Sequence, residues 1–307
     1  MTTEPYYDSE HEVIEKNVPG GLLDLPFDGN DYALGSIFKQ PDLSTLPESF
    51  WYSPQHIKSQ GDSDLCSGYA VTSAIELHED VELSPEYQFA RTRQLTNAPV
   101  DIFGANLRTA CSSAVKFGAK ESKYMPWTLE KNGRDFFAEF SNIPAEADNE
   151  AFEHRQKTYF AVKDVGYDLF DDIRLAIHSN RAEECAVVTG AKWRPEWLSS
   201  KDGIILPDYG DWGTGHAFVI LGYQWKPSAV SLKYEHYLVL QLSSGEKVGN
   251  RGLFYMDRMT ANKELHYGNF LFRDINPTYA RFLSETGEKY SPSLLGKLSS
   301  YYRALFA

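Results

Sequence analysis

Residues 60–76, QGDSDLCSGYAVTSAIE, decide how the rest of the chain is interpreted, because a turn-rich run changes there into a helical pattern. Apolar residues recur after Cys66 at three- and four-residue spacing, which predicts a helix with one buried face, running to about His78. A cysteine in the first turn of a helix lies at the positive end of the macrodipole, which favours the thiolate that attacks carbonyl carbon. Gln60, six positions earlier, can direct an amide N–H to the same place, as an oxyanion-hole donor does. The stretch therefore predicts a nucleophile with an oxyanion donor beside it.

The alternative interpretation of Cys66 is a small buried apolar residue, which is the commoner role of a lone cysteine. The other two cysteines, Cys111 and Cys185, lie in helical and strand-like apolar patterns and are predicted to be core residues. Three dispersed cysteines suit neither a disulfide framework nor a zinc site. We therefore expect a reducing, cytoplasmic compartment and no metal or other cofactor.

The composition excludes several classes of partner. The chain of 307 residues carries a net charge of −13, which argues against binding to nucleic acid or to an anionic membrane surface. It has no apolar run of the roughly 18 residues that a membrane-spanning helix needs. The first residues, MTTEPYYDSEHEVIEK, have neither a basic nor an apolar segment, so the sequence predicts no signal peptide.

The order of patterns predicts an α+β protein with two lobes. Residues 1–44 are irregular and rich in Pro and Gly, which predicts an arm that serves as a short prosegment or in assembly. Residues 45–275 form the main domain, with a helical lobe at about 60–150 and a β-rich lobe at about 151–275. Residues 276–307 are expected to form a C-terminal helical extension.

Local signals place the individual elements. A helix is predicted at 83–95, with Ser84 as its N-cap and Pro85 at the first helical position. Another is predicted at 106–118, where Gly118 ends it. The remaining segments are a strand-like stretch at 159–170, a short helix at 171–180 and strands at 184–193, 215–225, 236–243 and 252–258.

A thiol nucleophile needs a base, which is usually a histidine. Among the eight histidines, His216 differs because it follows the small-residue run GDWGTG and opens the apolar strand AFVIL. Glycines before a histidine let backbone or substrate approach closely. The alternative is a structural histidine at the start of a strand.

Three segments together resemble a known family. QGDSDLCSGYA resembles the active-site motif of papain-like cysteine peptidases, and TGHAFVILGY is similar to the histidine strand of that family. QLSSGEKVGNRGLFYM resembles its third motif, NSWGxxWGxxGY, with Gly245, Gly249 and Gly252 in register. The segments occur in family order, and the resemblance covers about residues 20 to 275.

The resemblance implies a papain-like fold, with a helical lobe built on the Cys66 helix, a barrel-like β lobe and a cleft between them. It implies Cys66 as the nucleophile, His216 as its base and later proton donor, and Gln60 with the Cys66 N–H as the oxyanion hole. Gly104 is expected to give a backbone contact to a peptide or protein substrate.

The chain departs from the family at the residue that orients the histidine. The asparagine that opens NSWG corresponds to Leu242, which cannot accept a proton from His216. Gln241 and Ser243 are adjacent polar residues that could substitute, although strand alternation points both away from the face of Leu242 unless a bulge changes the phase. Ser244 stands in place of the tryptophan of the same motif.

Three hypotheses follow. The first is a thiol peptidase, or a related amide or isopeptide hydrolase, weakened by the missing asparagine. The second is an impaired papain-like fold that serves as a structural or binding component of a larger assembly such as a phage virion. The third is transglutaminase-like acyl transfer, which the spacing of Gln60 and the register of the glycines make less favourable than the first.

Overall fold

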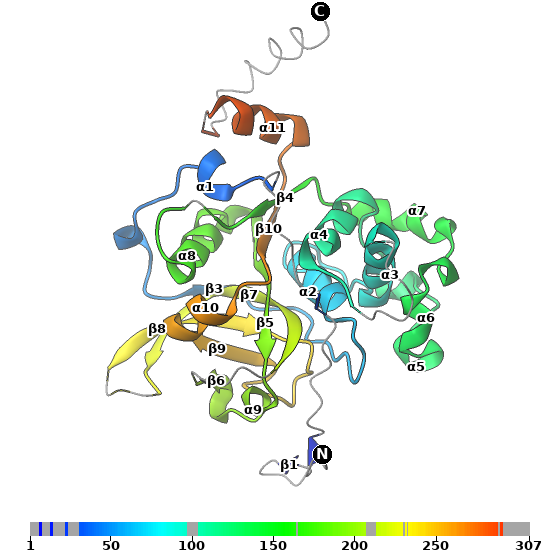
Figure 1. The fold of residues 1–307 in the computed structure, drawn as a ribbon, viewed down its shortest axis with the longest axis horizontal. Helices are drawn as coiled ribbons and strands as arrows, with labels where there is room; N and C mark the ends of the chain where they lie inside the picture. Colours follow the sequence, from blue (N-terminus) through cyan, green and yellow to red (C-terminus); the bar gives the residue numbers. More distant parts are fainter. Residues whose placement is uncertain are drawn as a thin grey trace, which may run out of the picture.

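The computed structural model has two lobes that lie side by side, one helical and one built on a β-sheet (Figure 1). It describes residues 6–7, 13–14, 22–23, 31–96, 104–163, 165–206, 213–229, 231, 233–287 and 289–290. The α+β class and the two lobes are as predicted. In the described ranges, every helix is too short or too polar to cross a membrane.

The helical lobe contains α2 (Cys66–Ile75), α3 (Pro85–Thr96), α4 (Leu107–Lys116), α5 (Leu129–Asn132), α6 (Arg134–Ala138) and α7 (Asp148–Ala151). The predicted cap of α3 is confirmed, because the Ser84 hydroxyl accepts a hydrogen bond from the Tyr87 N–H at 3.2 Å. Gly118 ends the α4 segment with φ of +83°, and a Cβ there would lie 1.8 Å from the Ala151 carbonyl oxygen. Both local signals were therefore sufficient to place these helices.

The β lobe is an eight-stranded sheet in the order β4, β10, β5, β7, β8, β9, β6, with β3 paired to β7. Its strands are β3 (Phe50–Trp51), β4 (Thr158–Ala161), β5 (Val187–Trp193), β6 (Ile204–Ile205), β7 (Thr214–Pro227), β8 (Tyr234–Gln241), β9 (Leu253–Asp257) and β10 (Asn269–Arg273). The pairs are antiparallel except β6 with β9. The expected barrel-like closure is wrong: among the described residues the sheet is open, because the short strands β4 and β6 end the order without pairing to each other.

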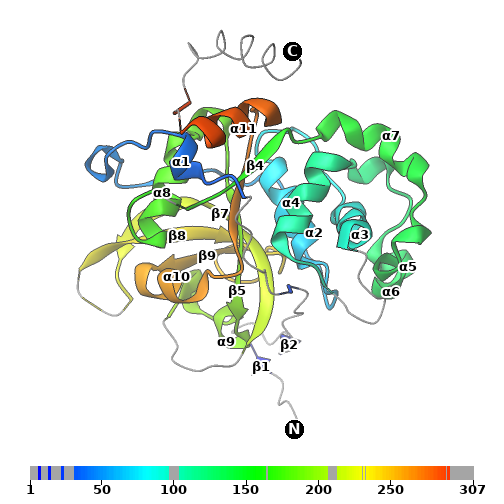
Figure 2. The ribbon, with the colours of Figure 1, turned by 45° about the horizontal axis from the view of Figure 1, so that its top comes forward.

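Helices α8 (Leu169–Ser179), α9 (Pro195–Leu198) and α10 (Arg258–Glu264) belong to the β lobe, and α8 packs against both β7 and α10. The expected strand at 159–170 is shorter than predicted, since β4 ends at Ala161 and α8 begins at Leu169. Helix α11 (Pro277–Thr286) begins the predicted C-terminal extension and packs on α1 (Leu34–Ile37), as Figures 1 and 2 show. Most of the rest of that extension lies outside the described residues.

The predicted arm has more than one part. Strands β1 (Tyr6–Tyr7) and β2 (Val13–Ile14) form a small antiparallel pair. Further along, Leu34 and Ile37 are fully buried in the core of the β lobe, and Ala33 forms a β-bridge with Ala161. The segment from residue 31 to 38 is thus built into the β lobe.

Strand β7 separates two halves of the core. Its residues Phe218 and Ile220 face the core of the β lobe, whereas Ala217 and Val219 belong to the apolar cluster that also contains Cys66. Helix α2 packs directly on β7 and β5, so it lies along the boundary between the lobes (Figure 2). The first turn of α2 and the start of β7 therefore define the inter-lobe region.

Candidate active site

Cys66 is the first residue of α2, as predicted, and its side chain is fully buried. Leu65 is the N-cap residue, and its side chain forms no cap hydrogen bond. The helix itself ends at Ile75, three residues before the predicted end. The position gives the Cys66 thiol the field of a helix N-terminus.

His216 lies on β7, paired with Ala191 of β5, and is only 2% exposed. Its ring packs against the indole of Trp193, with ring centroids 6.0 Å apart. The helix that carries Cys66 packs on the strand that carries His216, and Cys66 shares an apolar cluster with Ala217, the next residue of that strand. The helix that begins with Cys66 and the strand that carries His216 therefore pack together at the boundary between the lobes.

Gln60 is held by a polar network that crosses the lobes. Its Oε1 accepts a hydrogen bond from the Ser243 hydroxyl, and its backbone N–H donates to the Ser243 carbonyl at 2.9 Å. Its Nε2 donates to the carbonyl of Ser63, whose hydroxyl donates back to the Gln60 carbonyl at 2.8 Å. An amide nitrogen carries two N–H groups, so the bond to Ser63 leaves a second donor on Gln60.

The residue in the asparagine position of the third motif, Leu242, is 2% exposed and belongs to the same apolar cluster as Trp193 and Phe254. An apolar wall therefore lies on the Trp193 side of the His216 ring. Aliphatic and aromatic carbon can support a ring by packing, but it cannot accept the proton of an imidazole N–H.

The two polar neighbours of Leu242 contact the segment before the nucleophile. The Gln241 amide donates to the His56 carbonyl at 2.6 Å, and Ser243 bonds to Gln60. Gln241 Oε1 is buried and has no hydrogen-bond partner among the described residues. Both side chains thus hold residues 56–60 against the end of β8, while Leu242 enters the core of the β lobe.

Two residues of the arm cross the boundary between the lobes beside these groups. The Leu22 N–H donates to the Gly215 carbonyl at 3.1 Å, and the Leu23 N–H donates to the Ala105 carbonyl at 3.1 Å. A Cβ on Gly215 would lie 2.5 Å from the Leu22 carbonyl oxygen. The prediction that a glycine before His216 permits close backbone approach is confirmed.

Gly104, the predicted substrate contact, precedes Ala105 and has φ of +113°, which favours glycine. Its carbonyl accepts a hydrogen bond at 3.1 Å from Nη1 of Arg93, a residue that is 1% exposed. The structure therefore places Gly104 beside the crossing arm and shows that α3 fixes its backbone.

Several residues of the site were not identified from sequence. No sequence motif marks four residues of the site, which are Trp193, Ala105, Arg93 and Leu22. Each of them contacts a residue more than ten positions away in the sequence. The glycines of GTGH were the signal that could have indicated an incoming backbone at Gly215.

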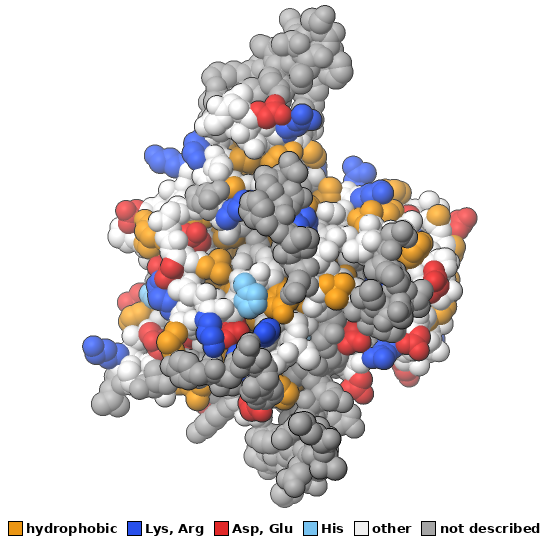
Figure 3. Space-filling model, viewed as in Figure 1, with side chains coloured by type: hydrophobic (Ala, Val, Ile, Leu, Met, Phe, Trp, Pro, Cys, Tyr) orange, Lys and Arg blue, Asp and Glu red, His pale blue; other side chains and the backbone are white. Residues whose placement is uncertain are grey.

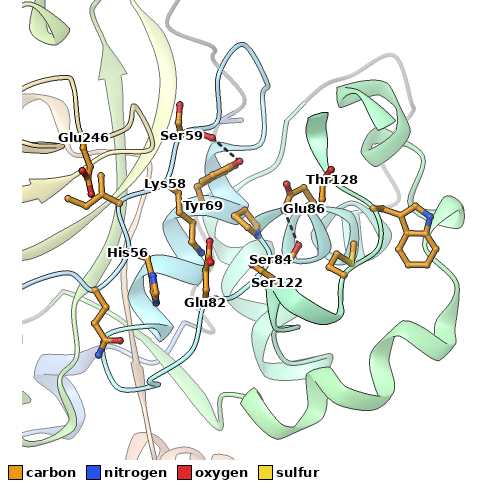
Figure 4. A pocket seen from close by; sticks show the side chains of 15 residues that line it. His56, Lys58, Ser59, Tyr69, Glu82, Ser84, Glu86, Ser122, Thr128 and Glu246 are labelled. Carbon is orange, nitrogen blue, oxygen red and sulfur yellow. Dashed lines mark hydrogen bonds between the residues drawn. The ribbon is translucent and has the colours of Figure 1, made fainter. Parts of the chain in front are cut away.

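Two surface hollows lie next to the Gln60 turn. One of about 480 Å³ is lined by residues that include Lys58, Tyr69 and Glu86 (Figure 4), and one of about 640 Å³ is lined partly by Gln60. Neither is lined by Cys66 or His216, which are buried. Within the described ranges no three His, Cys, Asp or Glu residues are grouped to hold a metal ion.

The face shown in Figure 3 carries acidic and basic side chains that are interspersed, without a continuous basic patch among the residues coloured there.

No protein-family model matches the sequence, and no curated protein matches it. Solved structures do match the fold. Xylellain, a cysteine protease from Xylella fastidiosa, superposes with a TM-score of 0.66 at 16% identity, over 86% of this chain and 100% of that chain. A procathepsin B from Trypanosoma congolense gives a TM-score of 0.58 at 13% identity, over 88% and 91% of the two chains. A digestive procathepsin L from Tenebrio molitor gives 0.57 at 12% identity, over 79% and 74%.

The chain has the papain-like cysteine peptidase fold.

In the papain-like frame, α2 is the central helix of the helical lobe and begins at Cys66, and β7 is the strand of the β lobe that carries His216.

Proposed function

We propose that the chain is a thiol peptidase that hydrolyses peptide, isopeptide or related amide bonds through an acyl-enzyme at Cys66. One observation carries the proposal: an extended backbone, Leu22–Leu23, is bound between the Gly215 and Ala105 carbonyls, one from each lobe. A boundary that binds one extended chain through main-chain hydrogen bonds has the properties of a peptide-binding cleft. The bound backbone also reaches the residue next to His216.

The proposed reaction has two stages. The Cys66 thiolate attacks the carbonyl carbon, and the oxyanion is stabilised by the Cys66 N–H and by Nε2 of Gln60. The imidazolium of His216 protonates the leaving amine as the C–N bond breaks, which gives a thioester on Cys66. Water, deprotonated by His216, then attacks the thioester and releases the acid.

The proposed enzyme is expected to have a low rate of turnover. His216 packs against Trp193, and Leu242 provides a hydrocarbon surface where the family has a side-chain acceptor. Loss of an orienting group lowers the rate while the nucleophile, base and oxyanion donors still act. We propose that the missing asparagine lowers turnover and does not abolish it.

The arm is part of the proposal, because Leu22 and Leu23 use carbonyl groups that a substrate backbone would use. We propose that the segment blocks the cleft and must leave before a substrate binds. Substitution of Leu22 by aspartate should expel it, since Leu22 is 7% exposed within an apolar cluster and a buried carboxylate is strongly disfavoured.

The test is alkylation by iodoacetamide of the full chain and of Leu22→Asp, with the modified cysteine identified by mass spectrometry. Cys66 should react at neutral pH, faster in Leu22→Asp, and Cys66→Ala should remove the reaction. Burial raises the pKa of the Cys111 thiol and raises that of Cys185 to about 12, so both should stay unmodified. Folded Leu22→Asp protein in which Cys66 does not react would overturn the proposal.

Leu242 favours the second candidate, an impaired papain-like fold that serves as a component of a larger assembly, because its apolar surroundings weaken the case for an efficient base. Hydrolysis of a peptide library by the Leu22→Asp chain separates the two candidates. Turnover by a chain that stays monomeric would count against the assembly role, whereas reaction of Cys66 without turnover of any peptide would count against the peptidase.

A further inference from the structure

Lys58 is a buried lysine that lies two residues before Gln60. Its side chain is 9% exposed, and that of its ion-pair partner Glu76 is 3% exposed. Glu76 is the C-cap residue of α2, so the pair joins the segment before the nucleophile to the far end of the helix that begins at Cys66. The ten residues of α2 rise by about 15 Å, which places the ion pair well away from the thiol.

The Lys58 ammonium uses all three of its N–H donors. It donates to the Glu76 carboxylate, to the Leu83 carbonyl at 2.6 Å and to the Thr72 hydroxyl at 3.5 Å. The Glu76 carboxylate also accepts a hydrogen bond from the Leu83 N–H at 2.6 Å. A buried charge without its partner is strongly disfavoured, so these contacts hold the Lys58 side chain in one place.

The backbone around Lys58 is bound by the β lobe. The Gly245 N–H donates to the Lys58 carbonyl at 3.1 Å. The next residue, Ser59, forms an antiparallel β-bridge with Ser244. Residues 58–60 therefore lie along the third motif as a short additional strand would.

Gln60 is attached to the same side. Among the described residues, its hydrogen bonds reach Ser63, within its own turn, and Ser243 of the β lobe. The other oxyanion donor of the proposed mechanism, the Cys66 N–H, belongs to α2 of the helical lobe. The two donors are thus carried by different lobes, and their separation depends on what connects residues 58–60 to α2.

Two side chains make that connection. One is Lys58, through its contacts with Thr72 and Glu76. The other is Tyr69 of α2, whose hydroxyl donates to the Ser59 carbonyl at 3.3 Å (Figure 4). An O–H···O bond of that length is weak, so the buried ion pair is the stronger of the two connections.

We propose that the Lys58–Glu76 pair positions Gln60 for the reaction, because it holds residues 58–60 to α2 and so fixes the distance between the Gln60 amide and the Cys66 N–H. Lys58 and Glu76 are positioning residues, since neither reaches the reacting atoms. The inference rests on the proposed peptidase function, of which the oxyanion hole is a part.

The test compares two reactions of Cys66 in the Leu22→Asp chain, which is designed to expel the arm. In acylation by 4-nitrophenyl acetate, the thiolate attacks the carbonyl carbon, a tetrahedral oxyanion forms, the C–O bond breaks and 4-nitrophenolate leaves. Alkylation by iodoacetamide displaces iodide from a saturated carbon and forms no oxyanion. The ratio of the two rates therefore measures the oxyanion hole and cancels changes in the thiol. Cys66→Ala supplies the background of ester hydrolysis.

The decisive variant combines Lys58→Met with Glu76→Gln, which removes both charges at similar volume. Its melting temperature should stay close to that of the parent, because loss of both partners of a buried ion pair is often neutral. Its ratio of acylation to alkylation should fall by roughly 10-fold to 100-fold, the cost of a displaced catalytic group. Lys58→Met alone should lower the ratio equally and also lower the melting temperature. A double variant with the ratio of the parent would assign the pair to stability alone and overturn the proposal.

Lys120→Met is the matched control. Lys120 is a second buried lysine of the helical lobe, 6% exposed at its side chain, and it pairs with Glu150 at 2.7 Å. It also donates to the Ala147 carbonyl at 3.2 Å. The variant should lower the melting temperature and leave the ratio unchanged. If it lowered the ratio as much as Lys58→Met does, destabilisation alone would explain the effect and the proposal would fall.

A measurement on Gln60 itself does not depend on the chemistry of Cys66. The ¹⁵N order parameter of its side-chain amide, assigned with Gln60→Glu, should be about 0.8 in the parent chain and below about 0.6 in the double variant. An unchanged order parameter overturns the inference whether or not the chain is a peptidase. A lower order parameter in the double variant, together with a Cys66 that never reacts, supports the positioning role and overturns the peptidase proposal alone.

Discussion

Different kinds of interaction surround the two halves of the candidate site. On the nucleophile side, Gln60 is tied to Ser63 and to Ser243, and the Ser243 bonds cross from one lobe to the other. On the base side, His216 packs against Trp193, and Leu242 extends the same apolar cluster. Directional hydrogen bonds position Gln60, whereas Trp193 and Leu242 contribute packing beside His216.

For the proposed peptidase, the difference indicates which half of the site would limit the rate. A hydrogen bond fixes both the position and the direction of a donor, while packing against an aromatic face restricts a ring without selecting its tautomer. In the proposed mechanism, the Gln60 donor is therefore held in place before substrate binds. On the imidazole side, Trp193 restricts the His216 ring by packing, and Leu242 cannot accept the proton of an imidazole N–H.

The largest expected effect comes from removing the reacting groups themselves. Cys66→Ala and His216→Ala should each lower peptide hydrolysis by roughly 1,000-fold or more, because nucleophile and base act as one unit. The measurement is kcat/KM on a leucine-containing fluorogenic peptide in the Leu22→Asp chain. If His216→Ala retained most of the activity, the base side would be silent and the comparison between the halves would fail.

The next effect tests the hydrogen-bonded half. Gln60→Ala should lower kcat by about 100-fold through loss of an oxyanion donor. Ser243→Ala, which only frees the Gln60 amide to rotate, should lower it by about fivefold, the value of one ordinary hydrogen bond. Gln55→Ala, on an exposed residue before the turn, is the control. Equal losses in the Gln60 and Ser243 variants would contradict the proposed division of roles.

Activity is expected to rise when a hydrogen-bond acceptor is introduced into the apolar half of the site. Leu242→Asn should raise kcat by about tenfold by supplying an acceptor for the imidazole, at some cost in stability for a buried amide. Leu242→Ala is the matched control, because it removes the same hydrocarbon without adding an acceptor and should destabilise the fold by about 3 kcal/mol. Thermal melts and turnover are measured on both. An alanine variant as fast as the asparagine variant would show that crowding, and not orientation, limits His216.

The smallest effect is expected from a residue outside both halves of the site, and its variant serves as a reference for the other variants. Burial raises the pKa of Asp172, on α8, from 3.8 to about 6. The folded state therefore holds this proton more tightly than the unfolded state, so the associated stability is present at low pH and is lost as pH rises from about 4 to about 6. Asp172→Asn, which cannot ionise, should flatten this loss in denaturant melts taken at pH 4 and pH 7. Its labelling rate at Cys66 should match that of the parent chain, and a changed rate would show that stability alone alters the site.

Local chemistry made much of the fold predictable. The start of α2 at Cys66, the Ser84 cap and the stop at Gly118 each depend on a few neighbouring residues, so the sequence could reveal them. Gly215 was predicted for the same reason, since three small residues precede one histidine. The fold class followed from the order of such local patterns.

The contacts that complete the site could not be predicted in this way. Ser243 reaches Gln60 across more than 180 residues, and Trp193 packs on His216 from a neighbouring strand, so neither contact leaves a local pattern. Closure of the sheet was mispredicted because it depends on whether the two edge strands, β4 and β6, meet. The pattern of a strand indicates which of its faces is buried, but it does not indicate which strand pairs with an edge strand.

The crossing of Leu22 and Leu23 also has a kinetic consequence. A ligand tethered to its own site acts at an effective concentration in the millimolar range, and dilution of the protein does not change it. Under the proposed function, a free peptide would compete with that fixed concentration, so the tether would raise the apparent KM while the rate of the saturated enzyme stays the same. The proposed enzyme would then cleave dilute peptides poorly. It would cleave substrate at high local concentration, such as peptides displayed in many copies on a surface.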